Sequence, residues 1–413
     1  MSNLTAIDLF AGAGGLSSGL INAGYKVVFA NEVEDIFAKT LKINHPDTEV
    51  AVGDIRDINS NIVRSNLGFD KGDLDLLVGG PPCQGFSINA PARNSEDKRN
   101  HLFLEYLKFV DEFRPKVAVI ENVPGMISFE KGETVNNIIQ ALTDLGYDVC
   151  VKILYMPHYG VPQMRWRTIF IATTENIDVE DLFPKPSHFS LGRANFTTKL
   201  QGKSLIANFD VVKSIAEHPT HVTVQETISD LPPIENGGGD GQQDYISSPN
   251  GQYQEYLREN NKKIKNHICA GLGSINLERL KHIPAGGSWR DIPYDLLPQG
   301  MKKARRSDHT KRYGRLHPDG ISSTILTKCD PHWGSYIHPY QDRIISVREA
   351  ARFQSFQDSY VFFGKLSEQY KQVGNAVPPL FAQKLGEAIA FKLNYKNHSI
   401  KKPLPGQQLS LAM

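Results

Sequence analysis

Three groups of residues in this 413-residue chain have types and spacing suited to chemistry. Cys83 follows two glycines and two prolines, Glu121 follows a short apolar run, and Arg165 and Arg167 are separated by one residue. A cysteine thiolate is a strong nucleophile, and arginine donors can hold a phosphate or a carbonyl group. Few acids end an apolar strand by chance when a neighbouring strand ends in Pro-Pro-Cys. The set therefore favours a catalytic site.

Each of these residues also has an ordinary structural explanation. Cys83 could be a small buried apolar residue, as most free cysteines are. Glu121 could cap a helix or form an ion pair, and the two arginines could form salt bridges at a sheet edge. The elements around the residues decide between these interpretations.

Two apolar runs predict the strands that position Cys83 and Glu121. Residues 74–78 and 115–120 are short, apolar and bounded by Gly or Pro, which is typical of buried parallel strands. Open α/β sheets bind ligands at the carboxyl ends of their strands. The prolines before Cys83 fix φ and remove two donors, so we expect a stiff turn there.

The N-terminal residues predict a nucleotide-binding turn. Residues 6–10 read as a first strand, and the glycines of residues 12–15 precede a helix that reaches about Ala23. Glycines at this place let backbone N–H groups approach a ligand closely. Glu32 ends a second strand, where an acid can bind a ribose diol. NAD, FAD and AdoMet enzymes share such a turn, and a purely structural tight turn is the alternative.

Composition narrows the class of protein. Hydrophobic residues make up 40% of the chain and charged ones 22%, as in an ordinary globular protein, and the net charge is only +1. Four cysteines lie far apart without a C-x-x-C pair, which argues against a disulfide framework or a zinc site and fits a reducing cytosol. The chain has no signal-peptide pattern and no apolar run that approaches a membrane span.

The α/β alternation stops at about Asn176, and a loop-rich region follows. Residues 261–315 contain 13 Lys or Arg against four Asp or Glu, with Trp289, Tyr294 and Tyr313 between them. This pattern is typical of a surface that contacts phosphates, although a solvated face is the alternative. Regular structure returns at Ser346, which predicts a capped helix, and a final helix should reach about Leu393.

Together these motifs resemble the DNA (cytosine-5)-methyltransferases, specifically the compact bacterial restriction–modification type. The matching segments occur in family order: Asp8-Leu9-Phe10-Ala11-Gly12-Ala13-Gly14-Gly15, Pro81-Pro82-Cys83-Gln84-Gly85-Phe86-Ser87, Glu121-Asn122-Val123, Gln163-x-Arg165-x-Arg167, Arg348-Glu349-Ala350-Ala351-Arg352 and Gly374-Asn375-Ala376-Val377. They cover about residues 5–175 and 340–395. Each motif is modest alone, but the six together are specific.

The resemblance implies an α/β fold with a Rossmann-like, AdoMet-dependent methyltransferase domain. Its sheet should be mostly parallel, and a smaller, irregular target-recognition domain should accompany it. We expect residues 1–178 to form the first part of the catalytic domain and 179–340 the target-recognition domain. Residues 341–395 should return to the catalytic domain, and 396–413 should form a tail.

The resemblance also implies a reaction at carbon 5 of cytosine in a specific short sequence of double-stranded DNA. Cys83 would add covalently to carbon 6 of a flipped base, and Glu121 would hold the N3 and amino edge. Arg165 would support the carbonyl edge and the thiolate, with Arg167 nearby. No metal is required.

The same resemblance assigns binding residues. The cofactor S-adenosyl-L-methionine (AdoMet), converted to S-adenosyl-L-homocysteine, would contact Phe10, Ala11, Gly12, Gly14, Gly15, Leu16, Glu32, Val33, Asp54, Ile55, Pro81, Leu102, Asn375 and Ala376. Glu32 would bind the ribose, and Asp54 and Ile55 the adenine. Many relatives carry a Trp where Val33 stands, so we expect weaker stacking on the adenine here. DNA contacts are expected at Ser87, Arg99, Arg312, Arg315 and Thr324.

Expectations about partners follow from the same family. We expect a monomeric enzyme of the bacterial cytoplasm that acts at the nucleoid and does not bind a membrane. A cognate restriction endonuclease would act on the same DNA site without forming a stable complex with it. Three alternatives stay open: a nicotinamide oxidoreductase, a tRNA cytosine-5 methyltransferase, and a DNA-binding protein without catalysis. AdoMet protection against thermal unfolding would exclude the first, and duplex DNA tested against tRNA would separate the second.

Overall fold

The computed structural model describes residues 4–82, 102–206, 219–259 and 261–393. These residues form two compact units. Unit 1 combines the chain up to Tyr159, Trp166–Pro219 and the C-terminal helix α13 (Pro379–Lys392), and unit 2 combines Gly160–Arg165 with Thr220–Pro378.

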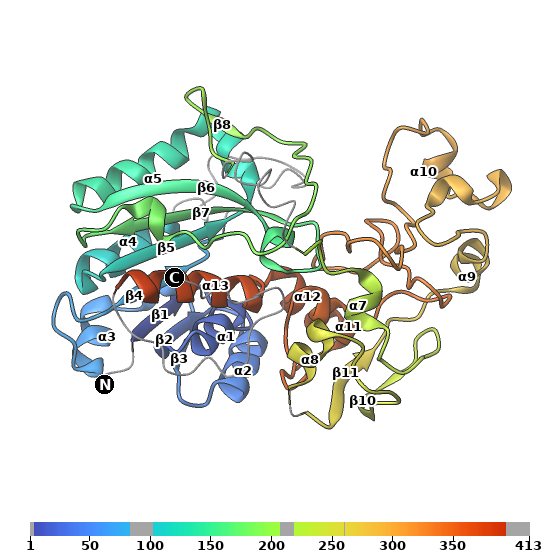
Figure 1. Cartoon of the computed structure of the whole chain (residues 1–413), viewed down its shortest axis with the longest axis horizontal. Helices are drawn as coiled ribbons and strands as arrows, with labels where there is room; N and C mark the ends of the chain where they lie inside the picture. The colour runs from blue at the N-terminus through green and yellow to red at the C-terminus, as the bar shows by residue number, and fades with distance from the viewer. Residues whose placement is uncertain (1–3, 83–101, 207–218, 260, 394–413) are drawn as a thin grey trace, which may run out of the picture. The chain divides into compact units, whose positions relative to one another are not determined.

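Unit 1 is built on a seven-stranded sheet with the order β3-β2-β1-β4-β5-β7-β6 (Figure 1). Only β7 runs antiparallel to its neighbours, β5 and β6, and the other pairs are parallel. The expected Rossmann-like, mostly parallel sheet is therefore confirmed. The strands are β1 (Thr5–Leu9), β2 (Lys26–Glu32), β3 (Glu49–Val52), β4 (Leu76–Gly79), β5 (Val117–Asn122), β6 (Asp148–Tyr155) and β7 (Trp166–Thr173).

Strand order reverses at β1, which lies between β2 and β4. Ligands of open α/β sheets bind at such a reversal. The strands there are buried on both faces, which explains why their sequences are apolar without alternation: all four residues of β4 are buried. Tyr106 anchors a helix beneath them, because its hydroxyl lies 3.0 Å from the carbonyl oxygens of both Leu77 and Val119.

Helices cover the sheet of unit 1, and two of them come from opposite ends of the chain. Helix α1 packs against α13, and the two lie side by side in Figure 1. A Cβ atom on Gly386 would lie 2.9 Å from the Cβ of Ala23, so glycine permits this close approach. Besides α13, the main helices of unit 1 are α1 (Gly15–Asn22), α2 (Asp35–Asn44), α3 (Ser60–Leu67), α4 (Leu102–Phe113) and α5 (Glu133–Asp144), and they contact one another or strands.

Unit 1 also contains short elements between and after the strands. They are the 3₁₀ turns η1 (Ile55–Asp57), η3 (Pro124–Gly132), η4 (Met156–Tyr159) and η5 (Val179–Leu182), and the hairpin of β8 (Lys199–Leu200) and β9 (Lys203–Ser204). The amide of Ile153 in β6 donates to the carbonyl of Leu205 at 2.7 Å, which ties the segment after the hairpin to the sheet.

Unit 2 has little regular structure, as expected for this part of the chain. Its only described sheet pairs β10 (Gly239–Asp244) with β11 (Lys263–Ile268) in antiparallel fashion. Its helical elements are short: α7 (Val224–Ile228), α8 (Gln252–Arg258), α9 (Ser274–Leu280), η7 (Trp289–Asp291), η8 (Tyr294–Leu296), α10 (Gln299–Lys302), α11 (Val347–Phe353) and α12 (Leu366–Asn375). Ser346 caps α11 with Glu349 in a capping box, as the sequence predicted.

Buried ion pairs hold unit 2 together. Arg352 of α11 donates to Asp358 at 2.9 and 2.6 Å and also pairs with Asp230, while Arg258 of α8 donates to Asp230 at 2.6 Å. The side chains of all four residues are at most 9% exposed. Such pairs cost much to break because a lone buried charge stays behind.

The two units divide the chain differently from the predicted domain boundaries. Residues 179–219 belong to unit 1, and residues 341–378 belong to unit 2. The pairing of Arg352 with Asp230 shows why: α11 completes the core of unit 2. The chain returns to unit 1 only at α13. None of the helices in the described ranges combines the length and apolar character of a membrane span.

Candidate active site

The turn between β1 and α1 has the backbone shape that the glycines predicted. Phe10, Gly12 and Gly14 have φ values of 58°, 59° and 88°, a left-handed conformation that glycine adopts at little cost. A Cβ atom on Gly12 would meet no described atom within 4 Å, so this part of the turn borders open space. Gly14, the N-cap residue of α1, provides no side-chain cap, and within the first turn the N–H of Ser17 donates to Asp8. The remaining N–H groups at the start of this helix are suited to a polar ligand.

Glu32 closes the turn from the end of β2. Its Oε2 accepts from the backbone N–H of Gly12 at 2.8 Å, and its Oε1 accepts from that of Glu34 at 2.9 Å. Burial raises the pKa of this carboxyl. Asn31, the preceding residue, donates to the carbonyls of Ala51 and Gly53 and so fixes the neighbouring end of β3. Glu32 thus lies at the turn where the sequence placed it.

Residues further along this edge have mixed environments. Val33 is 60% exposed, whereas Ile55 is buried. Asp54 accepts from the backbone and the guanidinium of Arg56, at 3.0 and 2.9 Å. The side-chain hydrogen bond from Arg56 lowers the pKa of Asp54 to about 2. The sequence expected Asp54 beside an adenine and did not predict its arginine partner.

Two titratable side chains support the turn, Asp8, which is buried, and His45, which is partly buried, and neither was predicted as a site residue. Asp8 of β1 accepts from the N–H and the hydroxyl of Ser17, at 3.1 and 2.6 Å, and its Oδ1 has no hydrogen bond within the described residues. Burial raises its pKa to about 7. The Nε2 of His45 lies 3.0 Å from the Ser18 hydroxyl, and burial lowers the pKa of His45 to about 4.

The ends of β4 and β5 are tied together by Asn122. Its side-chain amide donates to the carbonyl of Pro81 at 3.1 Å, and its Oδ1 accepts from the N–H of Val123 at 2.8 Å. A Cβ atom on Gly80 would lie 3.3 Å from the Oε2 of Glu121, so glycine leaves room for this carboxylate. The strand end that leads into the proline pair therefore lies beside Glu121.

Glu121 forms an ion pair with Arg167, the Nε of which lies 2.5 Å from its Oε1. Strand register explains the meeting. Glu121 of β5 lies opposite Ile169 of β7, so Arg167, two residues earlier in β7, is on the same face and within diagonal reach. Both side chains are 13% exposed. A charged pair that is mostly desolvated but still accessible can bind a polar substrate edge.

Arg165 has a different set of partners from Arg167. Its guanidinium donates to the backbone carbonyls of Ile325, Gly374 and Ala376 at 3.0–3.3 Å, and the residue is only 1% exposed. Strand β7 begins at Trp166, so the alternation expected to point both arginines the same way does not include Arg165. The structure thus associates Arg167, and not Arg165, with Glu121.

Gln163, like Arg165, forms hydrogen bonds within unit 2, and this structural role was not predicted from the sequence. Its Oε1 accepts from the N–H of Ile325 at 2.8 Å, and its amide donates to Gln354 at 2.9 Å. The Gln-x-Arg segment therefore ties together three parts of unit 2, at Ile325, at Gln354 and at residues 374–376. The Gln-x-Arg-x-Arg motif indicated that these residues matter, but the sequence does not show which of the three side chains faces a substrate.

Some of the remaining predicted site residues lie outside the described ranges, and the others lie in both units. Cys83, Ser87 and Arg99 lie outside the described residues. Leu102 begins α4 in unit 1, while Asn375 and Ala376 follow one another at the end of α12 in unit 2.

Of the three DNA contacts expected in unit 2, Arg315 and Thr324 bind other groups of the unit, whereas Arg312 is half-exposed. Arg315 is buried and donates to the carbonyls of Leu280, Ile283, His338 and Gln341 and to Asp342. All its guanidinium nitrogens are bound within the unit, so Arg315 supports the fold of unit 2 and we no longer expect it to contact DNA. Thr324 donates to the carbonyl of Met164 at 2.5 Å. Arg312 is half-exposed, and its guanidinium lies 5.7 Å from the ring centre of Trp333.

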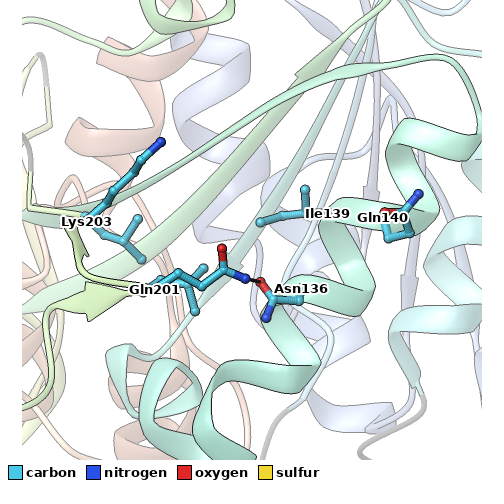
Figure 2. Close-up of a pocket in the computed structure, with 7 residues that line it drawn as sticks. Asn136, Ile139, Gln140, Gln201 and Lys203 are labelled. Atoms are coloured by element: carbon cyan, nitrogen blue, oxygen red, sulfur yellow. Dashed lines mark hydrogen bonds between the residues drawn. The ribbon is translucent and has the colours of Figure 1, made fainter.

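A depression of about 430 Å³ lies elsewhere in unit 1, between α5 and the β8–β9 hairpin (Figure 2). Figure 2 shows Gln201 of the hairpin directed toward Asn136 of α5, which it reaches at 3.4 Å. The lining consists of amides, one lysine and aliphatic side chains, without an acid, histidine or cysteine. We therefore place the candidate active site at the strand ends and not in this depression.

Fold and strand ends together define an α/β enzyme of the methyltransferase class. Residues 4–390 match the family of C-5 cytosine-specific DNA methylases, and the chain belongs to that family. The type II methyltransferase M.AgeI of Thalassovita gelatinovora is 32% identical over 434 residues, which cover 94% of this chain and 99% of the relative. The expected family and enzyme class, DNA (cytosine-5)-methyltransferase, are thereby confirmed.

Other relatives are much longer than this chain. DNA (cytosine-5)-methyltransferase 4 of Arabidopsis thaliana is 34% identical over 445 residues, which cover 96% of this chain but 29% of the relative. Among solved structures, a candidate DNA modification methyltransferase encoded within an E. coli prophage has a TM-score of 0.70 and 25% identity, over 95% of this chain and 99% of that one. The Dnmt2 methyltransferase of S. pombe, at a TM-score of 0.55 and 14% identity, shares the fold.

Proposed function

We propose that this protein methylates carbon 5 of cytosine within one short sequence of double-stranded DNA. One observation carries the proposal: the Glu121–Arg167 pair lies beside the strand end that leads into Pro81-Pro82 and Cys83. A carboxylate and a guanidinium at one point suit a cytosine, which presents an amino group, a ring nitrogen and a carbonyl along one edge.

In the proposed mechanism Cys83 is the nucleophile. Carbon 5 of an intact cytosine ring is a poor nucleophile, and thiolate addition at carbon 6 makes it enamine-like. Glu121 holds the N3 and amino edge and offsets the charge that develops as the ring is attacked. After methylation the proton leaves carbon 5, and the thiolate is eliminated. The base must leave the duplex to reach these groups.

We assign the carbonyl edge of the base to Arg167 and a positioning role to Arg165. Arg167 supports this assignment because it is paired with Glu121 and partly exposed. The donors of Arg165 are bound to backbone carbonyls, so it holds the segment that precedes β7.

The residues of the turn fit AdoMet as the cofactor. The backbone is left-handed at Gly12 and Gly14, the turn borders open space at Gly12, and Glu32 closes the turn. AdoMet supplies an electrophilic methyl group when bound. Phe10 and Gly12 would hold it at the turn, Glu32 would orient its ribose, and Ile55 would contact the adenine.

We further propose a role in a restriction–modification system. M.AgeI, a type II methyltransferase, spans almost the same length as this chain. Methylation would then protect host DNA from a nuclease that reads the same site, and the two enzymes need not form a stable complex. We propose a monomer that acts in the bacterial cytoplasm.

Bisulfite sequencing tests the proposal. Plasmid DNA is prepared from a host that lacks cytosine methylation and expresses this protein. Protected cytosines in one recurring short sequence are the expected result. A Cys83→Ser variant is the matched control, and it should bind AdoMet and DNA but leave all cytosines unprotected.

A folded, AdoMet-binding protein that protects no cytosine in DNA would contradict the proposal. The same preparation is then assayed on tRNA with radiolabelled AdoMet. Label transferred to tRNA and not to duplex DNA would establish the alternative substrate.

A further inference from the structure

One tryptophan of unit 2 is held in solvent. The chain has three tryptophans, and Trp333 is 62% exposed, whereas Trp289 is 4% exposed and Trp166 is half-buried. A single exposed apolar residue needs no explanation by itself. Trp333 differs because the guanidinium of Arg312 lies 5.7 Å from its ring centre, within the range of a cation–π contact.

The turn that carries Trp333 is firmly supported. The carbonyl of Asp330 accepts from the N–H of Trp333 at 2.9 Å, and its carboxylate accepts from the N–H of His332 at 2.8 Å. His332 in turn lies 2.7 Å from the hydroxyl of Tyr313, a fully buried residue whose N–H donates to Pro331 at 2.6 Å. The exposed indole is therefore carried by a turn that hydrogen bonds hold in place.

A strongly basic segment adjoins this turn. Residues 302–312 contain six bases and one acid: Lys302, Lys303, Arg305, Arg306, Lys311 and Arg312 against Asp308. The carbonyl of Lys311 accepts from Ser335 at 3.2 Å, and that of Arg312 accepts from Trp289 at 3.0 Å. These bonds fix the end of the basic segment beside the tryptophan turn. Positive charge and an aromatic face thus occur together on one surface of unit 2.

The same surface adjoins the Gln-x-Arg-x-Arg segment. The Nζ of Lys311 lies 3.9 Å from the Sδ of Met164, the residue between Gln163 and Arg165. Met164 is itself held by Thr324 and by a bond from its N–H to Ser322 at 2.9 Å. The basic segment beside Trp333 therefore contacts the part of the Gln-x-Arg-x-Arg segment that belongs to unit 2.

We propose that Trp333 stacks on a nucleobase of the DNA substrate, with Arg312 and Lys311 binding the flanking phosphates. Indole rings stack on every base, and such contacts occur beside basic side chains in nucleic-acid sites. A protein partner fits less well, because an indole beside an arginine, with six bases and one acid in the adjoining residues 302–312, suits a polyanion. This inference rests on the proposed DNA substrate.

The test measures binding to a duplex that contains the site found by bisulfite sequencing. Trp333→Ala should weaken affinity roughly ten- to hundredfold at fixed salt, as expected for loss of one base-stacking contact. Trp333→Phe, which keeps a ring, should retain most of the affinity. Tyr340→Ala is the matched control, because Tyr340 is also 62% exposed, but its ring lies beside His338 and its hydroxyl donates to Gln225. Thermal unfolding with and without AdoMet shows that each variant is folded and binds cofactor.

Fluorescence gives a second readout, since Trp333 is the most exposed of the three tryptophans. DNA should quench the emission of the wild-type protein, and Trp333→Phe should remove most of this quenching. Wild-type affinity of Trp333→Ala, or equal losses in the Ala and Phe variants, would overturn the stacking proposal while leaving the methyltransferase function intact. If the wild-type protein neither binds nor methylates duplex DNA, the proposed function itself fails.

Discussion

Glu121 and Arg167 meet because two neighbouring strands place them on one face of the sheet. The pair is 13% exposed, so its mutual attraction is stronger than that of a surface pair, and a substrate can still reach it. Arg165, two residues away, uses its donors on backbone carbonyls instead. The two arginines carry the same charge and differ in their partners: Arg167 pairs with a carboxylate, and Arg165 binds backbone carbonyls.

The pair leads to a kinetic prediction. Arg167→Ala should lower kcat by about 10²- to 10⁴-fold, because a charged donor to the reacting base is lost. Arg167→Lys should recover part of the rate, since the charge returns without the planar donors. AdoMet binding should be unchanged in both. Methyl transfer measured in single-turnover reactions checks this, and a normal rate for Arg167→Ala would remove Arg167 from the mechanism.

Asp8 leads to a prediction about pH. Burial raises its pKa from 3.8 to about 7, so between these values the folded state holds a proton that the unfolded state has released. Stability contributed by this group is complete below pH 4 and is lost as the pH rises to 7. Asp8→Asn cannot ionise and keeps an oxygen for Ser17. Its Tm relative to wild type should therefore be higher at pH 8 than at pH 5, as measured by calorimetry.

A control isolates this effect from general pH changes. Asp47 is exposed, so Asp47→Asn should show the same Tm difference at both pH values. A flat Tm difference for Asp8→Asn as well would mean that Asp8 is ionised in the folded protein throughout this range.

At the scale of elements, the contact of α1 with α13 depends on glycine. A Cβ atom at Gly19 would clash with Ala382 and with the carbonyl of Pro379. Alanine normally favours a helix over glycine by about 1 kcal/mol. Here the lack of space should reverse the sign, because either the two helices must separate or the backbone must shift.

We therefore predict that Gly19→Ala lowers the free energy of unfolding by about 1–3 kcal/mol, as overpacking does. Gly300→Ala is the matched control: Gly300 lies in α10, and a Cβ atom there would meet no described atom within 4 Å. That substitution should be neutral or slightly stabilising. Denaturant unfolding measures both, and a stable Gly19→Ala protein would show that the two helices tolerate greater separation.

The elements also show how far the sequence could predict the structure. Strands β4 and β5 and their end residues were predictable because buried apolar runs stop abruptly at Gly-Gly-Pro-Pro and at Glu121. Helices α2 and α3 were not identified. The partners of Arg165 lie at residues 325, 374 and 376, and those of Arg315 at 280–342. Such distant contacts leave no local pattern, so neither buried arginine could be distinguished from a substrate ligand.

At the scale of the whole molecule, charge distribution matters more than net charge. The chain carries only +1, yet residues 302–312 concentrate six bases. Binding to a polyanion releases counterions in proportion to the phosphates contacted, whatever the total charge of the protein. Unit 2 can therefore account for most of the salt dependence of DNA binding.

Replacing Lys302, Lys303, Arg305 and Arg306 with alanine should reduce the slope of log K against log salt by about 1 to 4, because each lost phosphate contact contributes about 0.9. The control removes the same charge from unit 1 by changing the exposed residues Lys26, Lys39, Lys42 and Lys108. Titrations at several salt concentrations give both slopes. Equal effects of the two sets would mean that overall charge, and not this segment, governs binding.

The pairing of α1 with α13 has a consequence for biosynthesis. Gly19 leaves the ribosome 367 residues before Gly386, so at about 5–20 residues per second roughly 20 to 70 s separate the two partners. During this interval the face of α1 that α13 covers, which includes Gly19 and Leu20, has no partner helix. Nascent chains that stall within unit 2 would therefore expose this apolar surface, and we expect chaperones and proteases to bind them.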